Sequence, residues 1–209
     1  MNSKKKNNIL KKIRLALTES TPIPFSDVET DNNIYQPAPS DMVIEFAEKF
    51  TELQGKFCYC LNREELFTEL NKLVSEKNWR KVYSQKEFIT ENFDRNIITA
   101  DLDNCDVSIT TCEKLIARTG TIVFGSNISR ISSVYAPVHI CIATSSQLVY
   151  DHIEAIEEFK NKFPQQFPSS LSFATGPSRT ADIEKTLVVG VHGPKEVYCF
   201  LVDDIQQAS

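Results

Sequence analysis

Glycine is scarce in this chain. Only 6 of the 209 residues are glycine, whereas average usage of about 7% would give roughly 15. They are Gly55, Gly120, Gly125, Gly176, Gly190 and Gly193. Dinucleotide-binding fingerprints and P-loops need several closely spaced glycines, so the composition argues against a glycine-rich phosphate cradle.

The chain also lacks any C-x-x-C pair, although it has six cysteines, at positions 58, 60, 105, 112, 141 and 199. Zinc and iron–sulfur sites use closely spaced ligands. We therefore expect no iron–sulfur cluster and no structural zinc on this chain, and the cofactor stays unknown. No secretory apolar segment follows the basic N-terminus, so we interpret the cysteines as reduced thiols of a cytoplasmic protein.

Neither an excess of basic residues nor a long apolar run is present. The net charge is −5, which argues against a protein that binds nucleic acid mainly through phosphate contacts. Residues 131–150 contain no Asp, Glu, Lys or Arg, but Pro137, His139 and several hydroxyl side chains interrupt this stretch. We predict no membrane span.

Composition divides the chain at about residue 40. Residues 1–40 combine a basic amphipathic helix over Asn7–Leu17 with a linker over Glu19–Ser40 that holds four prolines. The helix is expected to contact an acidic membrane surface or a partner, or to pack on the domain or on a neighbouring copy in a homo-oligomer. Residues 41–209 are predicted to form one α/β domain.

Apolar periodicity predicts alternating helices and strands from residue 42 onward. Strands are expected over 56–61, 81–84, 106–110, 121–124, 139–143, 171–175, 187–191 and 197–202. Helices are expected over 42–54, from Asn62 through Leu73, over 112–118 and over 149–163, with Asn62 as an N-cap. This order indicates an open α/β fold with a mainly parallel sheet covered on both faces.

Strand-to-helix loops at the carboxyl edge of such a sheet are where ligands bind. One such loop precedes a helix that we expect to begin near Ser178. Its free backbone N–H groups, hydroxyls and guanidinium would suit an anion, although simple helix capping explains the pattern equally well. The candidate ligand-binding residues are Thr175, Gly176, Pro177, Ser178, Arg179, Thr180, Asp182 and Glu184.

A histidine between glycines follows the next predicted strand. His192 has Gly193 and Pro194 after it, and its near-neutral pKa suits a general acid or base, so it is the candidate catalytic residue. A tight turn is the alternative. Ser178, Asp182 and His192 are too weak a pattern to assign a catalytic triad.

A third segment, Ile109–Thr121, carries the candidate ligand-binding residues Thr110, Gly120 and Thr121. Their hydroxyls could line a polar site or simply close turns. His139 opens an apolar run and is interpreted as a buried histidine with a satisfied hydrogen bond.

Four segments together resemble the lactate utilization protein C family, the small LUD-domain proteins: Thr175–Glu184, Val188–Pro194, Ile116–Ile122 and Ala136–Ile140. The resemblance implies a Rossmann-like fold similar to the sugar-phosphate isomerase and coenzyme A transferase group. It also implies a place beside iron–sulfur subunits in bacterial oxidation of L-lactate to pyruvate. The sequence departs from the family at Arg118, where an acid is usual.

The leading hypothesis is therefore an accessory component of lactate oxidation that binds a small anionic metabolite near Ser178 and His192. In this hypothesis Asp182 and Glu184 orient the anion cradle or a cation. One alternative is an independent enzyme or binding protein for a nucleotide, phosphosugar or coenzyme A thioester. A protein-interaction module is the other, and the sequence leaves open whether the chain is catalytic.

Overall fold

The computed structural model describes residue 11 and residues 41–125, 130–164, 168–181, 187–190 and 192–204. Of residues 130, 180, 181, 187 and 188, only the backbone is described. The chain divides into two compact units, Met1–Pro37 and Ala38–Ser209, and all described residues except Lys11 belong to the second. The N-terminal helix and linker thus lie outside the described residues, and they stay a prediction.

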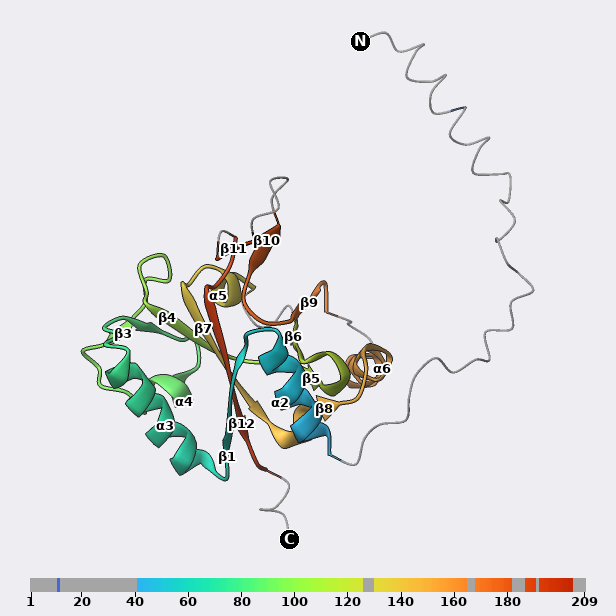
Figure 1. Cartoon of the computed structure of the whole chain (residues 1–209), viewed down its shortest axis with the longest axis horizontal. Coiled ribbons are helices and arrows are strands. Elements are labelled where there is room, and N and C mark those ends of the chain that lie inside the picture. The colour runs from blue at the N-terminus through green and yellow to red at the C-terminus, as the bar shows by residue number, and fades with distance from the viewer. Residues whose placement is uncertain are drawn as a thin grey trace. The chain divides into compact units, whose positions relative to one another are not determined.

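Six parallel strands form the central sheet, in the order β1-β12-β7-β4-β2-β3 (Figure 1). Their bounds are Lys56–Cys60 for β1, Val82–Tyr83 for β2, Ile98–Thr99 for β3, Val107–Thr111 for β4, Val138–Thr144 for β7 and Glu196–Val202 for β12. Almost every residue of β4, β7 and β12 is buried, as expected for a parallel sheet covered on both faces. The predicted α/β class is confirmed.

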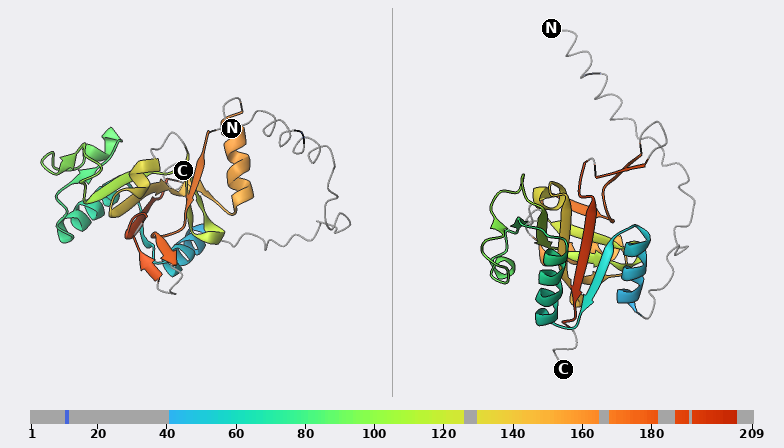
Figure 2. Two further views of the ribbon diagram at one scale, coloured as in Figure 1. Left: turned by 90° about the horizontal axis from the view of Figure 1, so that it is seen from above. Right: turned by 60° about the vertical axis from the view of Figure 1, so that its left-hand side comes forward.

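Helices cover both faces of this sheet (Figure 2). They are α2, Met42–Glu52, on one face, and α3, Arg63–Glu76, with α4, Glu87–Thr90, on the other. Residues of α3 pack against Ile140 of β7, whereas residues of α2 pack against its neighbour Cys141. Successive residues of a strand point to opposite faces, so the two helices lie on opposite sides. None of the described helices is long and apolar enough to cross a membrane.

Side-chain caps start these two helices, and the N-cap predicted at Asn62 is confirmed. The Asp41 carboxylate accepts hydrogen bonds from the backbone N–H groups of Val43 and Ile44. The Asn62 side chain accepts one from Glu65 N at 2.9 Å. Each cap satisfies backbone donors that the first turn of a helix leaves without a partner.

A second sheet has the order β8-β5-β6-β9, with β6 antiparallel to both β5 and β9. Its strands are β5, Lys114–Ile116; β6, Thr121–Gly125; β8, Leu148–Val149; and β9, Leu171–Ala174. The predicted helix over 112–118 is wrong, because β5 pairs with β6 and β8 there and only a 3-10 turn, η1 (Ala117–Thr119), follows. The strand predicted over 121–124 exists, but it belongs to this second sheet.

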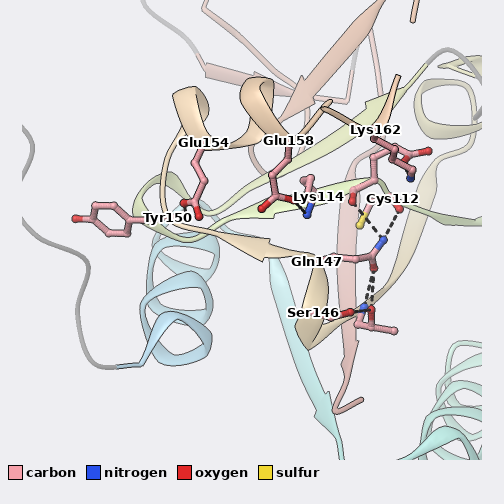
Figure 3. A network of polar contacts seen from close by, with 10 residues as sticks. Cys112, Lys114, Ser146, Gln147, Tyr150, Glu154, Glu158 and Lys162 are labelled. Carbon is pink, nitrogen blue, oxygen red and sulfur yellow. Dashed lines mark hydrogen bonds and ion pairs between the residues drawn. The ribbon is translucent and has the colours of Figure 1, made fainter. Parts of the chain in front are cut away.

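Helix α6, His152–Lys162, covers the second sheet and is tied to it by charges (Figure 3). Lys114 of β5 forms an ion pair with Glu158, and Lys162 forms one with Glu113 at 2.8 Å. The predicted helix over 149–163 is confirmed except at its start, where Val149 lies in β8. Short helical turns, α5 (Arg130–Val134) and η2 (Ser145–Gln147), flank β7.

The helix predicted to begin near Ser178 is wrong. Residues Arg179–Ala181 form β10, which pairs antiparallel with β11, Leu187–Val189, as a separate two-stranded ribbon. The N–H of Gly190 donates to the Ser178 carbonyl at 3.0 Å and continues this pairing. Cross-strand bonds thus bind backbone groups that a helix start would have left free. Asp182 and Glu184 lie outside the described residues.

Candidate functional site

The segments around Ser178 and His192 meet at the amino ends of β7 and β12. Ser178 N donates to the Pro194 carbonyl at 3.0 Å, and Lys195 N donates to the Pro137 carbonyl at 2.8 Å, immediately before β12 and β7 begin. The expectation that these loops lie at the carboxyl edge is therefore wrong. It fails because β9, which precedes Ser178, belongs to the second sheet and not to the parallel one.

A cavity of about 420 Å³ opens where these segments meet. Two histidines and three serines provide most of its polar lining. Its described walls comprise Phe124, Ser133, Val134, His139, Leu171, Ser172, Phe173, Ala174, Gly176, Ser178, His192, Gly193, Pro194 and Val197. We call it the His139 cavity. Its described lining contains no lysine or arginine, so its polar side chains are hydroxyls and imidazoles.

A neighbouring cavity of about 480 Å³ shares Val134, His192 and Gly193 with the first. It adds Lys195 and Tyr135 to the lining. His192 is exposed and lines both spaces, so it stands where they meet. The ammonium of Lys195 brings a positive charge close to the His139 cavity, whose own polar side chains are serines and histidines.

His139 is the most deeply buried polar side chain of the His139 cavity. It is only 2% exposed, and its Nε2 lies 2.8 Å from the Thr110 hydroxyl. Phe124 packs beside the ring, with the ring centroids 5.6 Å apart. Burial lowers the pKa of His139 to about 4, so the ring is neutral near pH 7. The neutral ring can take part in a hydrogen bond without placing a charge in the core.

Two buried hydroxyls beside this cavity have no hydrogen-bond partner among the described residues, those of Ser108 and Ser132. Ser108 lies opposite His139 in the register of β4 and β7, and Ser132 precedes the lining residue Ser133. A buried polar group without a partner is costly. Neither serine is among the described lining residues of the cavity, so these hydroxyls do not identify a ligand position.

The LUD domain, as a protein family, matches residues 77–202 of this chain, which is more than half of its length. The chain belongs to the LUD-domain family. The resemblance seen in the sequence is thus confirmed, and the Rossmann-like α/β arrangement fits it.

Named relatives of this LUD-domain chain include two proteins called "Lactate utilization protein C". The one from Bacillus subtilis is 35% identical over 122 residues, which are 56% of this chain and 50% of the relative. The one from Oceanobacillus iheyensis is 26% identical over 89% of this chain and 91% of the relative. In the stronger matches the chain thus spans about half the length of the curated relatives.

A solved structure of a DUF162-family protein from Deinococcus radiodurans has a similar fold. It superposes with a TM-score of 0.59 at 20% identity and covers 77% of this chain and 96% of that protein. At this identity the likeness concerns the fold.

Several predicted ligand residues of the LUD domain lie against helix α2 or the residue that follows it, and of these Arg179 and Gly120 do not line the cavity. The Arg179 guanidinium donates to the Leu53 carbonyl, just past the end of α2. A side chain on Gly176 would lie 2.6 Å from the same carbonyl oxygen. Gly120, with φ +59°, leaves space for Lys49, whose carbonyl carbon would lie 2.7 Å from an added Cβ. These contacts explain the residues through packing on α2.

The threonines named in the sequence bond to other side chains. The hydroxyl of Thr121 lies 2.9 Å from that of Thr175 and 2.7 Å from that of Thr119, and Thr110 bonds to His139. Pro177 is buried, and the side chain of Thr180 lies outside the description. Of the predicted set, Gly176, Ser178, His192 and Gly193 line the His139 cavity, and their role in binding stays a prediction.

The lining residues that the sequence analysis did not name as site residues include the polar side chains of Ser133, His139, Ser172 and Lys195. His139 offered one signal, because a histidine inside an otherwise apolar strand needs a polar partner. Ser133 and Ser172 offered no such signal, since nothing in the local sequence shows that α5 and β9 approach the same strand. Arg118, which replaces the acid usual in the family, is not among the described lining residues of either cavity.

Proposed function

We propose that this LUD-domain chain takes part in lactate utilization as an accessory component. The names of its relatives support a part in lactate utilization. The match to the Oceanobacillus iheyensis protein, which extends over most of both chains, supports it in particular. In this proposal iron–sulfur subunits carry out the oxidation of L-lactate to pyruvate, and this chain binds a small anionic metabolite for them.

The observation that carries the ligand proposal is the pairing of two histidines with three serine hydroxyls around one cavity. A small hydroxy acid or keto acid presents a carboxylate and one further oxygen. The hydroxyls and the exposed His192 can donate to these oxygens, and Lys195 in the adjoining cavity can balance the negative charge. His139 stays neutral, so its burial needs no counter-ion.

Calorimetric titration with L-lactate and with pyruvate tests the ligand proposal. We expect Ser178→Ala and His192→Ala each to weaken binding by about tenfold, as for the loss of one charge-assisted hydrogen bond. Ser75→Ala, an exposed serine on α3, is the matched control and should bind like the wild type. Equal affinity in all four proteins, or no saturable binding by the wild type, would count against the His139 cavity as the site.

Growth on L-lactate tests the role in the cell. Deletion of the gene should slow growth on L-lactate, and the wild-type copy should restore it. The His192→Ala copy should restore growth less well than the Ser75→Ala copy. Unchanged growth of the deletion strain, with no other lactate dehydrogenase present, would refute a part in lactate utilization even if the cavity binds an anion.

A further inference from the structure

A separate cavity of about 380 Å³ lies at the opposite edge of the parallel sheet. Thr111 and Thr144, which end β4 and β7, and Val202, which ends β12, all line it. His139 and Thr144, which line the two cavities, stand five residues apart on β7, which is roughly 16 Å along the strand at about 3.3 Å per residue. The carboxyl edge is where open α/β sheets bind ligands.

Arg63, the first residue of α3, lines the carboxyl-edge cavity. Its guanidinium lies 5.4 Å from the centre of the Phe88 ring, and its side chain is exposed. Among the described residues no carboxylate or carbonyl accepts a hydrogen bond from it. Stacking on an aromatic ring holds the planar guanidinium group in place and leaves its N–H donors available for an oxyanion.

The position of Arg63 is unfavourable for the helix itself. The start of a helix carries a partial positive charge, so a cation in the first turn is disfavoured there. The following residues, Glu64 and Glu65, show the usual preference for acids. The helix dipole therefore does not favour an arginine at this position, where Arg63 stacks on Phe88 and lines the cavity.

Lys162 supplies a second cation from α6, on the other side of the sheet. Its ammonium pairs with Glu113 at 2.8 Å, and the Gln147 amide donates to the Cys112 carbonyl at 2.7 Å (Figure 3). Gln147 also accepts a hydrogen bond from Thr144 N at 2.8 Å. These bonds fix the wall opposite Arg63. Two cations against one carboxylate leave the described lining net positive in a chain of net charge −5.

We propose that the carboxyl-edge cavity binds an oxyanion, a carboxylate or phosphate group, between the Arg63 guanidinium and the Lys162 ammonium. The Thr111 hydroxyl at the end of β4 is a further donor. The guanidinium fork matches two oxygens of either group. The ammonium can meet a third oxygen of a phosphate, whereas with a carboxylate it shares one of the same two oxygens. This site is distinct from the His139 cavity and does not depend on the function proposed for it.

The test uses the full chain, with inorganic phosphate and acetate as probes. Nuclear magnetic resonance titration measures the binding of each probe. We expect Arg63→Ala to weaken binding of the preferred probe by at least about tenfold, and Arg63→Lys to have an intermediate effect because it keeps the charge but loses the fork. Whichever probe binds more tightly identifies the group. Circular dichroism should show that both variants fold.

Lys72→Ala is the matched control, since it removes one positive charge from an exposed position of the same helix, where Lys72 pairs with Glu69. It should bind both probes like the wild type. His192→Ala should do the same, which separates this site from the His139 cavity. The proposal is overturned if no probe binds saturably, if Arg63→Ala binds like the wild type, or if Lys72→Ala weakens binding as strongly as Arg63→Ala.

Discussion

The hydroxyl of Thr110 and Nε2 of His139 lie 2.8 Å apart between the neighbouring strands β4 and β7. Thr110 is 6% exposed and His139 is 2% exposed, so water cannot easily replace either partner. The bond holds one ring nitrogen of His139 and thereby orients the ring beside the cavity. Thr110 is not among the described lining residues of the cavity, so we predict that it would affect a ligand only through His139.

Replacement of Thr110 by valine should lower the free energy of unfolding by about 2 kcal/mol, because His139 Nε2 then stays buried without a partner. Thr110→Ser keeps the hydroxyl and should cost only about 1 kcal/mol for the lost methyl group. Urea unfolding followed by the fluorescence of Trp79, the only tryptophan, measures both. Equal losses in the two variants would show that the hydrogen bond contributes little.

The free energy of unfolding should fall when the pH drops below about 6.5, which is the ordinary pKa of a histidine side chain. The pKa of His139 is about 4 in the folded protein, so the unfolded chain binds a proton first and is favoured as the pH falls from 6.5 towards 4. A difference of about 2.5 in pKa corresponds to a loss of about 3 kcal/mol over this range. Urea unfolding at a series of pH values measures it.

His139→Gln is the control for this pH dependence, since glutamine keeps hydrogen-bonding groups but does not titrate there. The variant should lose less stability between about pH 6.5 and pH 4 than the wild type. Other groups, such as Glu196, whose pKa the hydrogen bond from Lys56 lowers, titrate in both proteins and cancel in the comparison. Parallel curves for the two proteins would contradict the assignment to His139.

The strands of the parallel sheet except β3, and the long helices, could be predicted because their signals are local. The apolar residues of β7 and β12 form continuous runs, and Asp151 or Asn62 stands where a helix begins. Short elements were not predicted, because residues that are distant in the sequence determine their structure. The three residues of β5 form a strand only because β6 and β8 lie beside them, and no local pattern reports that pairing.

The candidate site was predicted less well than the fold, for the same reason. The residues after Ser178 have the composition of a helix start, but pairing with β11 makes them a strand. The carboxyl-edge rule then assigned the loop to the wrong edge of the sheet. Sequence reasoning did select His192 and Ser178, which line the His139 cavity, whereas the cavity itself depends on how the two sheets and α5 meet.

Gly120→Ala should destabilise the domain without a direct effect on ligand binding. At φ +59° a side chain is strained, and its Cβ would meet the backbone of α2, 2.7 Å from the Lys49 carbonyl carbon. We expect a loss of at least about 2 kcal/mol in the free energy of unfolding. The folded fraction should still bind L-lactate or pyruvate with wild-type affinity in calorimetry. A variant as stable as the wild type would contradict the close packing of η1 on α2.

Arg179→Ala distinguishes the anion cradle predicted from sequence from the arrangement in the structure. The Arg179 guanidinium donates to the Leu53 carbonyl beyond α2, so its loss should lower the free energy of unfolding by about 1 kcal/mol. Binding of L-lactate or pyruvate should not change, because the side chain does not line the His139 cavity.

Ser178→Ala, at the preceding residue, should have the opposite profile, with near wild-type stability and about tenfold weaker binding. Comparing the two neighbours in the same calorimetric and urea experiments separates a contact with ligand from a contact with α2. If Arg179→Ala abolished binding while Ser178→Ala had no effect, the guanidinium would have to turn from α2 into the cavity when the anion binds. The cradle predicted from the sequence would then be the better description of the site.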